Sequence, residues 1–441
     1  MDPHDDRSSP VLSRHEAAVA RVLVSVFLAV IAAVPAIEWV GARGGDTAGE
    51  TAWSHLTGLG ARVHERLAVD AGPGAGLPRR AVVANRAVLE GLAEFESALE
   101  NETRIGWLLR PPAQLLLSGR MGAGNDRVYV GRDGWLFYRP EVEYLTGAGF
   151  LDPSVLARRI STASEWTAPP QPDPRPAIIR FARQLDARGI ALVVMPTPLK
   201  PMVHPEKLAR GYGAPAAALQ NPSFAAFVED LRRAGVRVFD GSEDVVRARR
   251  STGRPQFLRT DTHWRPEAVA VVAHALAAFV SARVPMAATG DPGYSIETRE
   301  VTNSGDTAVM LDLPPGQVLY PQETVSIRRV LLPGGAAWRS SRAADVLVLG
   351  DSFSNIYSLA SMGWGDAAGF AEHLSAALGR PVDRIVQNSD GAFATRLALG
   401  RALASGDDRL AGKRVVIWQF AARELAVGDW RVLALPPPGD R

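Results

Sequence analysis

The stretch that most constrains the fold runs from Val346 to Ser352. Residues 346–349 form a continuous apolar run, which is typical of a strand buried on both faces of a parallel sheet. Gly350 ends the run, and Asp351-Ser352 leads into a segment that reads as a helix start. A serine at a strand-to-helix turn exposes its hydroxyl above the sheet edge, and its N–H belongs to a helix N-terminus. The turn therefore suits a nucleophile, although Asp and Ser are also ordinary N-cap residues.

A second stretch, residues 259–265, contains Asp261 and His263. If this segment is extended, the two side chains point to the same side, about 6.6 Å apart along the chain. Asp261 can then accept a hydrogen bond from one imidazole nitrogen and leave the other free to take a serine proton. The alternative is a helix entry with a buried histidine. Together with Ser352, the two stretches supply a Ser-His-Asp triad, a constellation whose chain order varies between folds.

The rest of the chain predicts an α/β fold with a doubly wound, mostly parallel sheet, because helices alternate with short β-branched runs. The predicted strands are residues 190–195, 236–240, 346–349, 383–387 and 414–420, and the predicted helices are 177–188, 224–234 and 267–284. A hairpin over residues 127–138 precedes them. Between residues 293 and 342 the pattern changes to short alternating strands with no clear helix, which predicts a β-rich insertion at about 290–342.

The N-terminus combines basic residues with an apolar run. Arg7, Arg14 and Arg21 precede the 16-residue run 22–37, which with its flanks approaches the ~20 residues of a bilayer helix. Basic residues on this side predict a cytoplasmic N-terminus and a signal-anchor, with the remainder outside the cytoplasm. A cleaved signal peptide is the alternative. The expected domains are residues 1–40 (anchor), 41–125 (linker with helical segments) and 126–435 (catalytic domain).

The composition excludes several classes of function. Lys plus Arg is 49 and Asp plus Glu is 47, giving a net charge of +2 without basic runs, so we expect no nucleic-acid partner. The chain has no cysteine, which excludes disulfides, a thiol nucleophile and thiolate metal sites. His204, His274 and His373 have no ligand spacing, so we predict no metal.

Four motifs together resemble those of a known family. They are Trp135-Leu-Phe-Tyr138 after Gly-Arg-Asp-Gly, Thr260-Asp-Thr-His-Trp264, Gly350-Asp-Ser-Phe-Ser354 and the stretch 418–424. In this order they resemble the AlgJ/AlgX family, alginate-type polysaccharide O-acetyltransferases with an SGNH-hydrolase-like fold. The resemblance covers about residues 80–430. It implies that Ser352 is the nucleophile, His263 the general base and Asp261 its orienter.

The resemblance also implies partners and a location. The acceptor would be a polysaccharide, and the protein would be periplasmic, held at the inner membrane by its anchor. Because acetyl-CoA does not belong outside the cytoplasm, a membrane-bound acyltransferase would relay the acetyl group, and no cofactor is expected. AlgX-type members carry a C-terminal carbohydrate-binding module, whereas this chain looks like the AlgJ type.

Four further positions are candidate substrate or oxyanion residues. Asn388 or the backbone at Gly391 is a candidate second oxyanion donor, and Asn388 can equally be a turn residue. Lys200 either binds the acceptor or, as we expect, is only exposed. Trp264 stacks on a sugar ring or, more in keeping with a buried position, packs in the core. Arg423 and Glu424 are expected to form an internal ion pair.

Three alternatives to the transferase remain open. Water as the acceptor would make the protein a carbohydrate acetylesterase with the same triad. A non-catalytic scaffold of an envelope polysaccharide complex would leave Ser352 without a role. A phosphate site at residues 350–352 is disfavoured, because the Gly-rich loop and Lys of such sites are missing.

Overall fold

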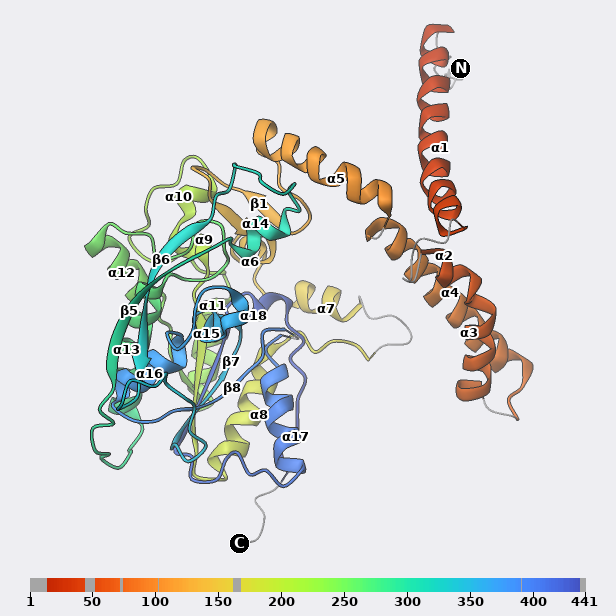
Figure 1. Ribbon diagram of the computed structural model, residues 1–441. Helices are drawn as coiled ribbons and strands as arrows, with labels where there is room; N and C mark the ends of the chain where they lie inside the picture. The colour runs from red at the N-terminus through yellow and green to blue at the C-terminus, as the bar shows by residue number, and fades with distance from the viewer. Residues whose placement is uncertain are drawn as a thin grey trace, which may run out of the picture. The chain divides into compact units, whose positions relative to one another are not determined.

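The computed structural model describes residues 14–43, 52–71, 74–101, 103–161, 168–389 and 391–436 (Figure 1). Residues 1–13, which belong to the polar stretch at the N-terminus, lie outside these ranges. The chain divides into two compact units, Met1–Ala113 and Gln114–Arg441.

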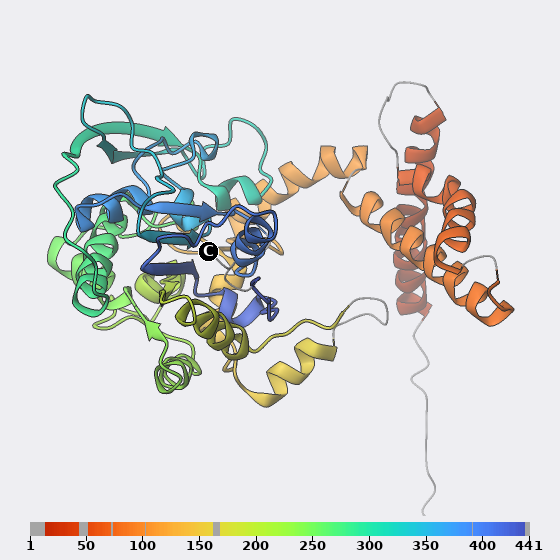
Figure 2. The same ribbon diagram turned by 90° about the horizontal axis from the view of Figure 1, so that it is seen from below.

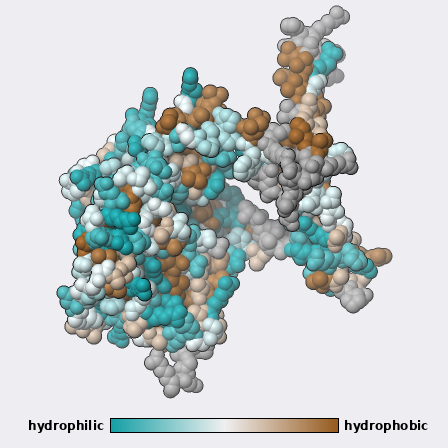
Figure 3. All heavy atoms as spheres, in the orientation of Figure 1, coloured by the Kyte–Doolittle hydropathy of each residue, from teal (hydrophilic) through white to brown (hydrophobic). Residues whose placement is uncertain are grey.

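The first unit begins with a long apolar helix, α1 (Arg14–Arg43). Its segment Val19–Ile37 is long and apolar enough to span a membrane, with a mean hydropathy of 2.4. Side chains such as Val24 and Phe27 are exposed on it, and Figure 3 shows hydrophobic atoms along this helix. The other described helix that meets this criterion, α13 (Pro266–Arg283), is partly buried in the second unit. The predicted N-terminal apolar helix is therefore present.

Short helices pack along a long one in the rest of the first unit. The Trp53 ring lies 5.2 Å from the Phe95 ring, and Leu59 lies so close to Gly91 that a Cβ there would clash with it. The helical path continues through Pro111-Pro112, which the sequence did not predict because proline lacks an amide donor. The elements are α2 (Ala52–Thr57), α3 (Leu59–Arg66), the π-helix η1 (Leu67–Ala71), α4 (Leu77–Asn101) and most of α5 (Arg104–Leu116), which ends in the second unit.

The second unit is built on a five-stranded parallel sheet with the strand order β4-β3-β9-β7-β8. Every residue of β7 and β9 is buried, as expected for strands covered on both faces. The predicted mostly parallel α/β sheet is therefore confirmed. The strands are β3 (Ala191–Thr197), β4 (Arg237–Val238), β7 (Val346–Gly350), β8 (Asp383–Val386) and β9 (Val415–Ala421).

Helices cover both faces of this sheet (Figures 1 and 2). On one face, Trp418 of β9 contacts Phe181 of α8 (Pro174–Asp186) and Arg396 of α17 (Ala394–Ala404). Helices α13 and α16 (Phe370–Leu378) lie side by side on the other face. Helices α16 and α17 were not among the predicted elements. The remaining helices are η2 (Leu117–Met121), α6 (Arg139–Thr146), α7 (Pro153–Ser161), α9 (Lys200–Val203), α10 (Pro205–Leu208), α11 (Phe224–Arg233), α12 (Ser242–Thr252), α14 (Asp306–Met310), α15 (Ser352–Asn355), η3 (Ala360–Met362) and α18 (Glu424–Val427).

Two antiparallel hairpins flank the sheet. The first pairs β1 (Val128–Val130) with β2 (Leu136–Tyr138), and the second pairs β5 (Ser295–Asn303) with β6 (Glu323–Leu331). The second hairpin lies within the stretch expected to be β-rich. Contrary to the prediction of no helix there, α14 lies between its strands. Five residues are too few to give a helical period, so the sequence pattern could not reveal α14.

Candidate active site

The turn after β7 places Ser352 at the first position of α15. Asp351 caps this helix, because its carboxylate accepts a hydrogen bond from the Phe353 N–H at 2.9 Å. The same carboxylate accepts from the Ala421 N–H at 2.6 Å, which ties the turn to the end of β9. Asp351 is therefore a fixed anchor of the turn.

The side-chain amide of Gln419 on β9 also holds this turn. Its amide oxygen accepts from the Asp351 N–H at 3.0 Å and from the Ser354 hydroxyl at 2.6 Å. Its amide nitrogen donates to Asp351 at 2.8 Å and to Thr197 of β3 at 2.7 Å. A buried amide with all these partners rigidifies its surroundings, so the backbone that carries Ser352 is held from two neighbouring strands.

Ser352, His263 and Asp261 form a continuous hydrogen-bonded chain. The Ser352 Oγ lies 2.9 Å from His263 Nε2, and His263 Nδ1 lies 2.7 Å from Asp261 Oδ1. A carboxylate only accepts hydrogen bonds, so Nδ1 carries the proton and Nε2 accepts from the serine. Asp261 and His263 are buried, whereas Ser352 is half-buried. The structure thus brings together the three residues that the sequence singled out.

The Asp261–His263 segment is a turn rather than the extended strand assumed in the sequence analysis. The Asp261 carboxylate accepts from the backbone N–H of His263 at 3.0 Å as well as from its ring. Such an Asx-type turn places an Asp side chain beside the residue two positions later. The bridge between Phe257 and Trp264 closes the loop that carries the turn. The predicted pairing is therefore present, with a different backbone conformation.

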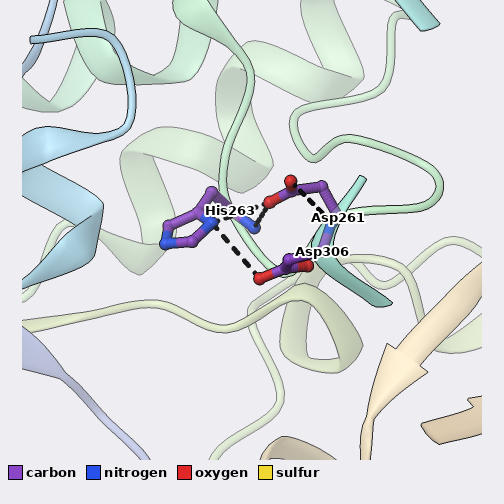
Figure 4. Close-up of side chains that lie close together, drawn as sticks. All are labelled: Asp261, His263 and Asp306. Atoms are coloured by element: carbon purple, nitrogen blue, oxygen red, sulfur yellow. Dashed lines mark hydrogen bonds and ion pairs between the residues drawn. The ribbon is translucent and has the colours of Figure 1, made fainter. Parts of the chain in front are cut away.

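A second carboxylate, Asp306 of α14, lies beside the pair (Figure 4). It accepts from the Thr262 N–H at 2.7 Å and from the Thr262 hydroxyl, and its own N–H donates to Asp261 at 3.0 Å. Its carboxylate is 3.7 Å from His263 Nδ1. Figure 4 shows both carboxylates on the same side of the imidazole. Asp306 was not predicted from the sequence, because it reaches the turn from the insertion, 44 residues beyond Thr262 in the chain.

The side chains of Asp261, His263 and Asp306 also bring together ligand atoms of the kind that bind metals, within 4.8 Å of one another. Both ring nitrogens of His263 are already engaged, with Asp261 and with Ser352. The outer oxygen of Asp261 accepts from the Asp306 N–H and from the Trp364 indole at 3.1 Å. A metal ion would have to displace these bonds, so the donor set fits a hydrogen-bonded triad better than a metal centre.

Burial and charge act in opposite directions on the two central groups. Burial alone would raise the pKa of Asp261, but the charge and hydrogen bonds of His263 lower this pKa to about 2. Burial would lower the pKa of His263, but the charge of Asp261 and its hydrogen bond raise this pKa above the ordinary value. Burial, together with the neighbouring Asp261 charge, raises the pKa of Asp306. Asp261 thus stays ionised and stabilises the protonated imidazole.

Two more charged groups hold the backbone just before the triad pair. The Glu323 carboxylate of β6 accepts from the Thr260 N–H at 2.9 Å and from its hydroxyl at 3.1 Å. Lys200 donates to the carbonyl oxygens of Leu136 at 2.7 Å and Arg259 at 3.3 Å. Lys200 is fully buried, so the expectation that it is exposed was wrong. Burial also lowers its pKa. Its chemistry is that of an internal cation which binds backbone carbonyls.

Trp264 packs in the core, as the sequence analysis favoured over sugar stacking. Its side chain is fully buried, and its indole N–H donates to the Phe353 carbonyl at 3.0 Å. The rings of Phe353 and Phe370 lie 5.6 and 5.9 Å from it. A ring with no exposed surface cannot receive a sugar, so Trp264 instead fixes the residue after Ser352.

The two candidate oxyanion positions lie on the loop after β8. Asn388 is exposed, and its side-chain oxygen accepts from Asn355 of α15 at 2.8 Å. Gly391 has a left-handed backbone with φ of 69°, and a Cβ there would lie 2.9 Å from Glu424. Among the described residues, no protein group accepts from the Ser352 N–H. Asn388 is thus linked to the helix that Ser352 begins.

Arg423 pairs with Glu141 of α6, at 3.0 Å, and not with Glu424 as expected. Burial raises the pKa of Glu141 to about 7, against the opposing charge of Arg423. The Arg423 guanidinium lies 5.7 Å from the centre of the Phe353 ring, which itself is 4.7 Å from the His263 ring. Glu424 instead accepts from the Ala392 N–H at 3.3 Å. The buried Arg423 guanidinium and the His263 imidazole therefore both lie close to the Phe353 ring.

Relatives of the chain carry a consistent description. "Probable alginate O-acetylase AlgJ" of Pseudomonas fluorescens is 28% identical over 261 residues, which are 57% of this chain and 62% of that protein. The Pseudomonas aeruginosa protein of the same description is 30% identical over 241 residues, 52% of this chain and 53% of its own length. The matched region therefore spans less than two thirds of either relative.

The fold also has a solved counterpart. The O-acetyltransferase domain of Pseudomonas putida AlgJ superimposes with a TM-score of 0.50 at 24% identity and covers 68% of this chain and 92% of that domain. At 24% identity this likeness shows a shared fold. The family model described as "SGNH hydrolase-like domain, acetyltransferase AlgX" matches residues 128–422, which include both hairpins, the whole parallel sheet and the triad. This chain therefore belongs to the AlgX family of SGNH hydrolase-like domains.

Proposed function

We propose that the protein is an O-acetyltransferase that acetylates hydroxyl groups of a polysaccharide through an acetyl-serine intermediate on Ser352. The observation that carries the proposal is the 2.9 Å contact between Ser352 Oγ and His263 Nε2, with Asp261 on the other ring nitrogen. The catalytic domain is residues 126–435. The AlgJ relatives are described as alginate O-acetylases, so alginate is the first acceptor to test.

In the first half-reaction, Ser352 Oγ attacks the carbonyl carbon of the acetyl donor while its proton moves to His263 Nε2. The imidazolium that forms is stabilised by Asp261. The tetrahedral intermediate then collapses, the bond from the carbonyl carbon to the donor's leaving group breaks, and His263 returns its proton to that group. The product is the acetyl ester of Ser352.

In the second half-reaction, a sugar hydroxyl takes the place of the leaving group. His263 removes the hydroxyl proton as the sugar oxygen attacks the acetyl carbon, and the proton then passes to Ser352 Oγ as the ester bond breaks. The acetyl group ends on the sugar oxygen and the serine is regenerated. The same imidazole therefore acts as base and acid in both halves.

The oxyanion of each tetrahedral intermediate needs two donors. We assign the first to the Ser352 N–H, which no described protein group uses. For the second we assign the Asn388 side-chain NH₂, because the Asn388 oxygen is held by Asn355 and the described partner of the NH₂ is the weakly accepting sulfur of Met362 at 3.6 Å. The alternative is the Gly391 backbone. Each donor of this kind contributes roughly 10²–10³-fold to the rate.

The apolar helix α1 supports a proposal for the location. We propose that Val19–Ile37 is an uncleaved signal-anchor in the inner membrane and that the catalytic domain lies in the periplasm. Because acetyl-CoA is cytoplasmic, the acetyl group would reach Ser352 through a membrane-bound acyltransferase partner.

The test uses p-nitrophenyl acetate as a soluble acetyl donor, with and without alginate oligosaccharides. A transferase gives acetylated oligosaccharide, and the acceptor accelerates nitrophenol release when deacylation limits the rate. An esterase gives only acetate, at a rate that the oligosaccharide leaves unchanged. A scaffold gives neither product, and Ser352→Ala then behaves as the parent protein does.

A further inference from the structure

Arg423 is a largely buried cation that neither half-reaction described above uses. It follows the end of β9, two residues after Ala421, whose N–H donates to the Asp351 carboxylate at 2.6 Å. The Arg423 carbonyl accepts from two N–H groups of α18, at 2.9 and 3.1 Å. The backbone that carries Arg423 is therefore tied to the turn that carries Ser352.

An ion pair and two aromatic rings hold the Arg423 guanidinium in place. It donates to Glu141, which has no exposed surface, at 3.0 Å. Its central carbon lies 5.3 Å from the centre of the Tyr138 ring and 5.7 Å from that of the Phe353 ring. A guanidinium is attracted to aromatic rings at such distances, most strongly where water is excluded. The position of this charge is therefore fixed.

The Phe353 ring links this charge to the triad. Phe353 is fully buried, and its ring lies 4.7 Å from that of His263. The guanidinium carbon and the imidazole are therefore within roughly 10 Å of each other, a distance at which two unit charges still interact in a protein. Salt screens buried charges much less than exposed ones. A fixed positive charge at Arg423 thus opposes the protonation of His263.

Arg423 acts against two carboxylates that surround the same imidazole. Burial lowers the pKa of His263, and the charges of Asp261 and Asp306 raise it. The charge of Arg423 lowers it again, although the net result stays above the ordinary value. Because a general base must be neutral at the working pH, a group that limits this rise favours catalysis.

The partner of Arg423 neutralises its charge only in part. Burial raises the pKa of Glu141 to about 7, against the opposing charges of Arg423 and Lys200. Glu141 is therefore partly protonated near neutral pH, and one of its carboxyl oxygens has no described partner. Lys200, the second buried cation near Glu141, donates to two backbone carbonyls. The pair of Arg423 and Glu141 thus keeps part of its positive charge.

We propose that Arg423 is a positioning residue for the acetyl transfer, whose fixed charge beside the Phe353 ring keeps His263 available as a neutral base. The proposal rests on the proposed function, because it takes His263 to be the group that accepts the Ser352 proton. It adds a residue that acts through the imidazole without contacting either substrate.

The test follows acetyl-serine formation from p-nitrophenyl acetate against pH, with the full-length protein in detergent. In Arg423→Gln the rising limb of the profile should move to higher pH by about half a unit or more, because the charge that opposes protonation is lost. Arg423→Lys keeps the charge and should restore the limb toward that of the parent. The double variant Glu141→Gln/Arg423→Gln leaves no buried ion unpaired, so it tests the same shift in a protein that does not lose stability to an unpaired charge.

The matched control is Arg396→Gln. Arg396 is also a buried arginine on an aromatic ring, 4.6 Å from the centre of Trp418, but it belongs to α17 on one face of the sheet. Its loss should leave the rising limb in place. A readout independent of turnover is the pKa of His263 by NMR of histidine-labelled Ser352→Ala protein, with the signal assigned by its absence from His263→Ala. Adding Arg423→Gln should raise this pKa.

An unchanged rising limb or an unchanged pKa of His263 in Arg423→Gln would overturn the inference, as would an equal shift in Arg396→Gln. Failure of the proposed function has a different signature, since the parent protein itself then forms no acetyl-serine at any pH. The NMR titration still measures the effect of Arg423 on His263 in that case, so the two failures are distinguishable.

Discussion

The proposed chemistry depends on the imidazole of His263, because each of its nitrogens has one defined partner. Nδ1 faces Asp261 at 2.7 Å and Nε2 faces Ser352 at 2.9 Å. The negative charge of Asp261 raises the pKa of His263 against the effect of burial. General-base catalysis needs the neutral imidazole, so the rate should rise with pH as His263 loses its proton.

Replacing Asp261 with Asn removes the charge that raises the pKa of His263. The pKa of His263 should therefore fall, and the rising limb of the pH–rate profile should move to lower pH. The maximal rate should drop by about 10³-fold or more, because the imidazole loses its orienting acceptor. Nitrophenyl acetate turnover measured from pH 5 to 9 checks both effects. If the rising limb of the Asp261→Asn profile lies at the same pH as that of the parent, Asp261 does not set the pKa of His263.

Asp306 should act as a positioning residue for the same imidazole. Because it binds Thr262 and lies 3.7 Å from His263 Nδ1, Asp306→Asn should lower the rate of serine acetylation by about tenfold. The effect should be less than additive with Asp261→Asn, since both carboxylates act on one ring. Asp312→Asn is the matched control, because Asp312 is exposed on the same insertion and has a φ of 53° that Asn tolerates. Additive losses would mean that Asp306 does not act through the imidazole that Asp261 orients.

Residue types and spacing predicted the Ser352, His263 and Asp261 grouping, but not the residues that hold its backbone in place. Asp261, His263 and Ser352 stand in short stretches that carry their own signal. Asp306 and Glu323 reach the turn through long-range contacts, which no local pattern encodes. Lys200 was expected at the surface because lysine is rarely buried, yet carbonyl oxygens satisfy its ammonium group inside the protein.

Among the elements, α14 depends on one close backbone approach. Gly305 precedes this helix, and a Cβ at Gly305 would lie 1.9 Å from the Thr260 carbonyl oxygen. Glycine is therefore needed here for space, since its φ of −72° is ordinary. The contact joins the insertion that carries Asp306 to the turn that carries Asp261.

The substitution Gly305→Ala should displace α14 from the turn. We expect a loss of about 1–3 kcal/mol in the free energy of unfolding, together with a loss of acetylation rate similar to that of Asp306→Asn. The control is Gly290→Ala, where a Cβ meets nothing within 4 Å. Urea unfolding measures the change in stability, and the rate of acetyl-serine formation measures the change in activity. A Gly305→Ala protein as stable and active as the control would contradict the described contact.

Strands with continuous apolar runs were predictable, whereas helices of four or five residues were not. The strands β3, β7 and β9 were expected from continuous apolar runs, and buried parallel strands require such runs. Helix α13 was expected from an apolar run after Pro266. Helices of four or five residues, such as α14 and α15, show no periodicity, and tertiary contacts define their bounds.

At the scale of the whole molecule, α1 gives the chain a candidate membrane segment outside the proposed catalytic domain. If Val19–Ile37 is a signal-anchor, the expressed protein should sediment with membranes, resist extraction by alkaline carbonate and retain its N-terminal residues by intact mass. The chain from residue 52 onward should be released without detergent. If the intact mass instead corresponds to a chain that begins after residue 37, the segment is a cleaved signal peptide.

The most direct measurement of the central claim is mass spectrometry of the protein after incubation with p-nitrophenyl acetate. We predict one acetyl group, located on the peptide that contains Ser352, and its loss in Ser352→Ala and His263→Ala. Ser361→Ala, which removes an exposed hydroxyl near the same helix, should keep the adduct. A folded protein that forms no adduct on Ser352, or an equal adduct in Ser352→Ala, would contradict the acetyl-serine mechanism.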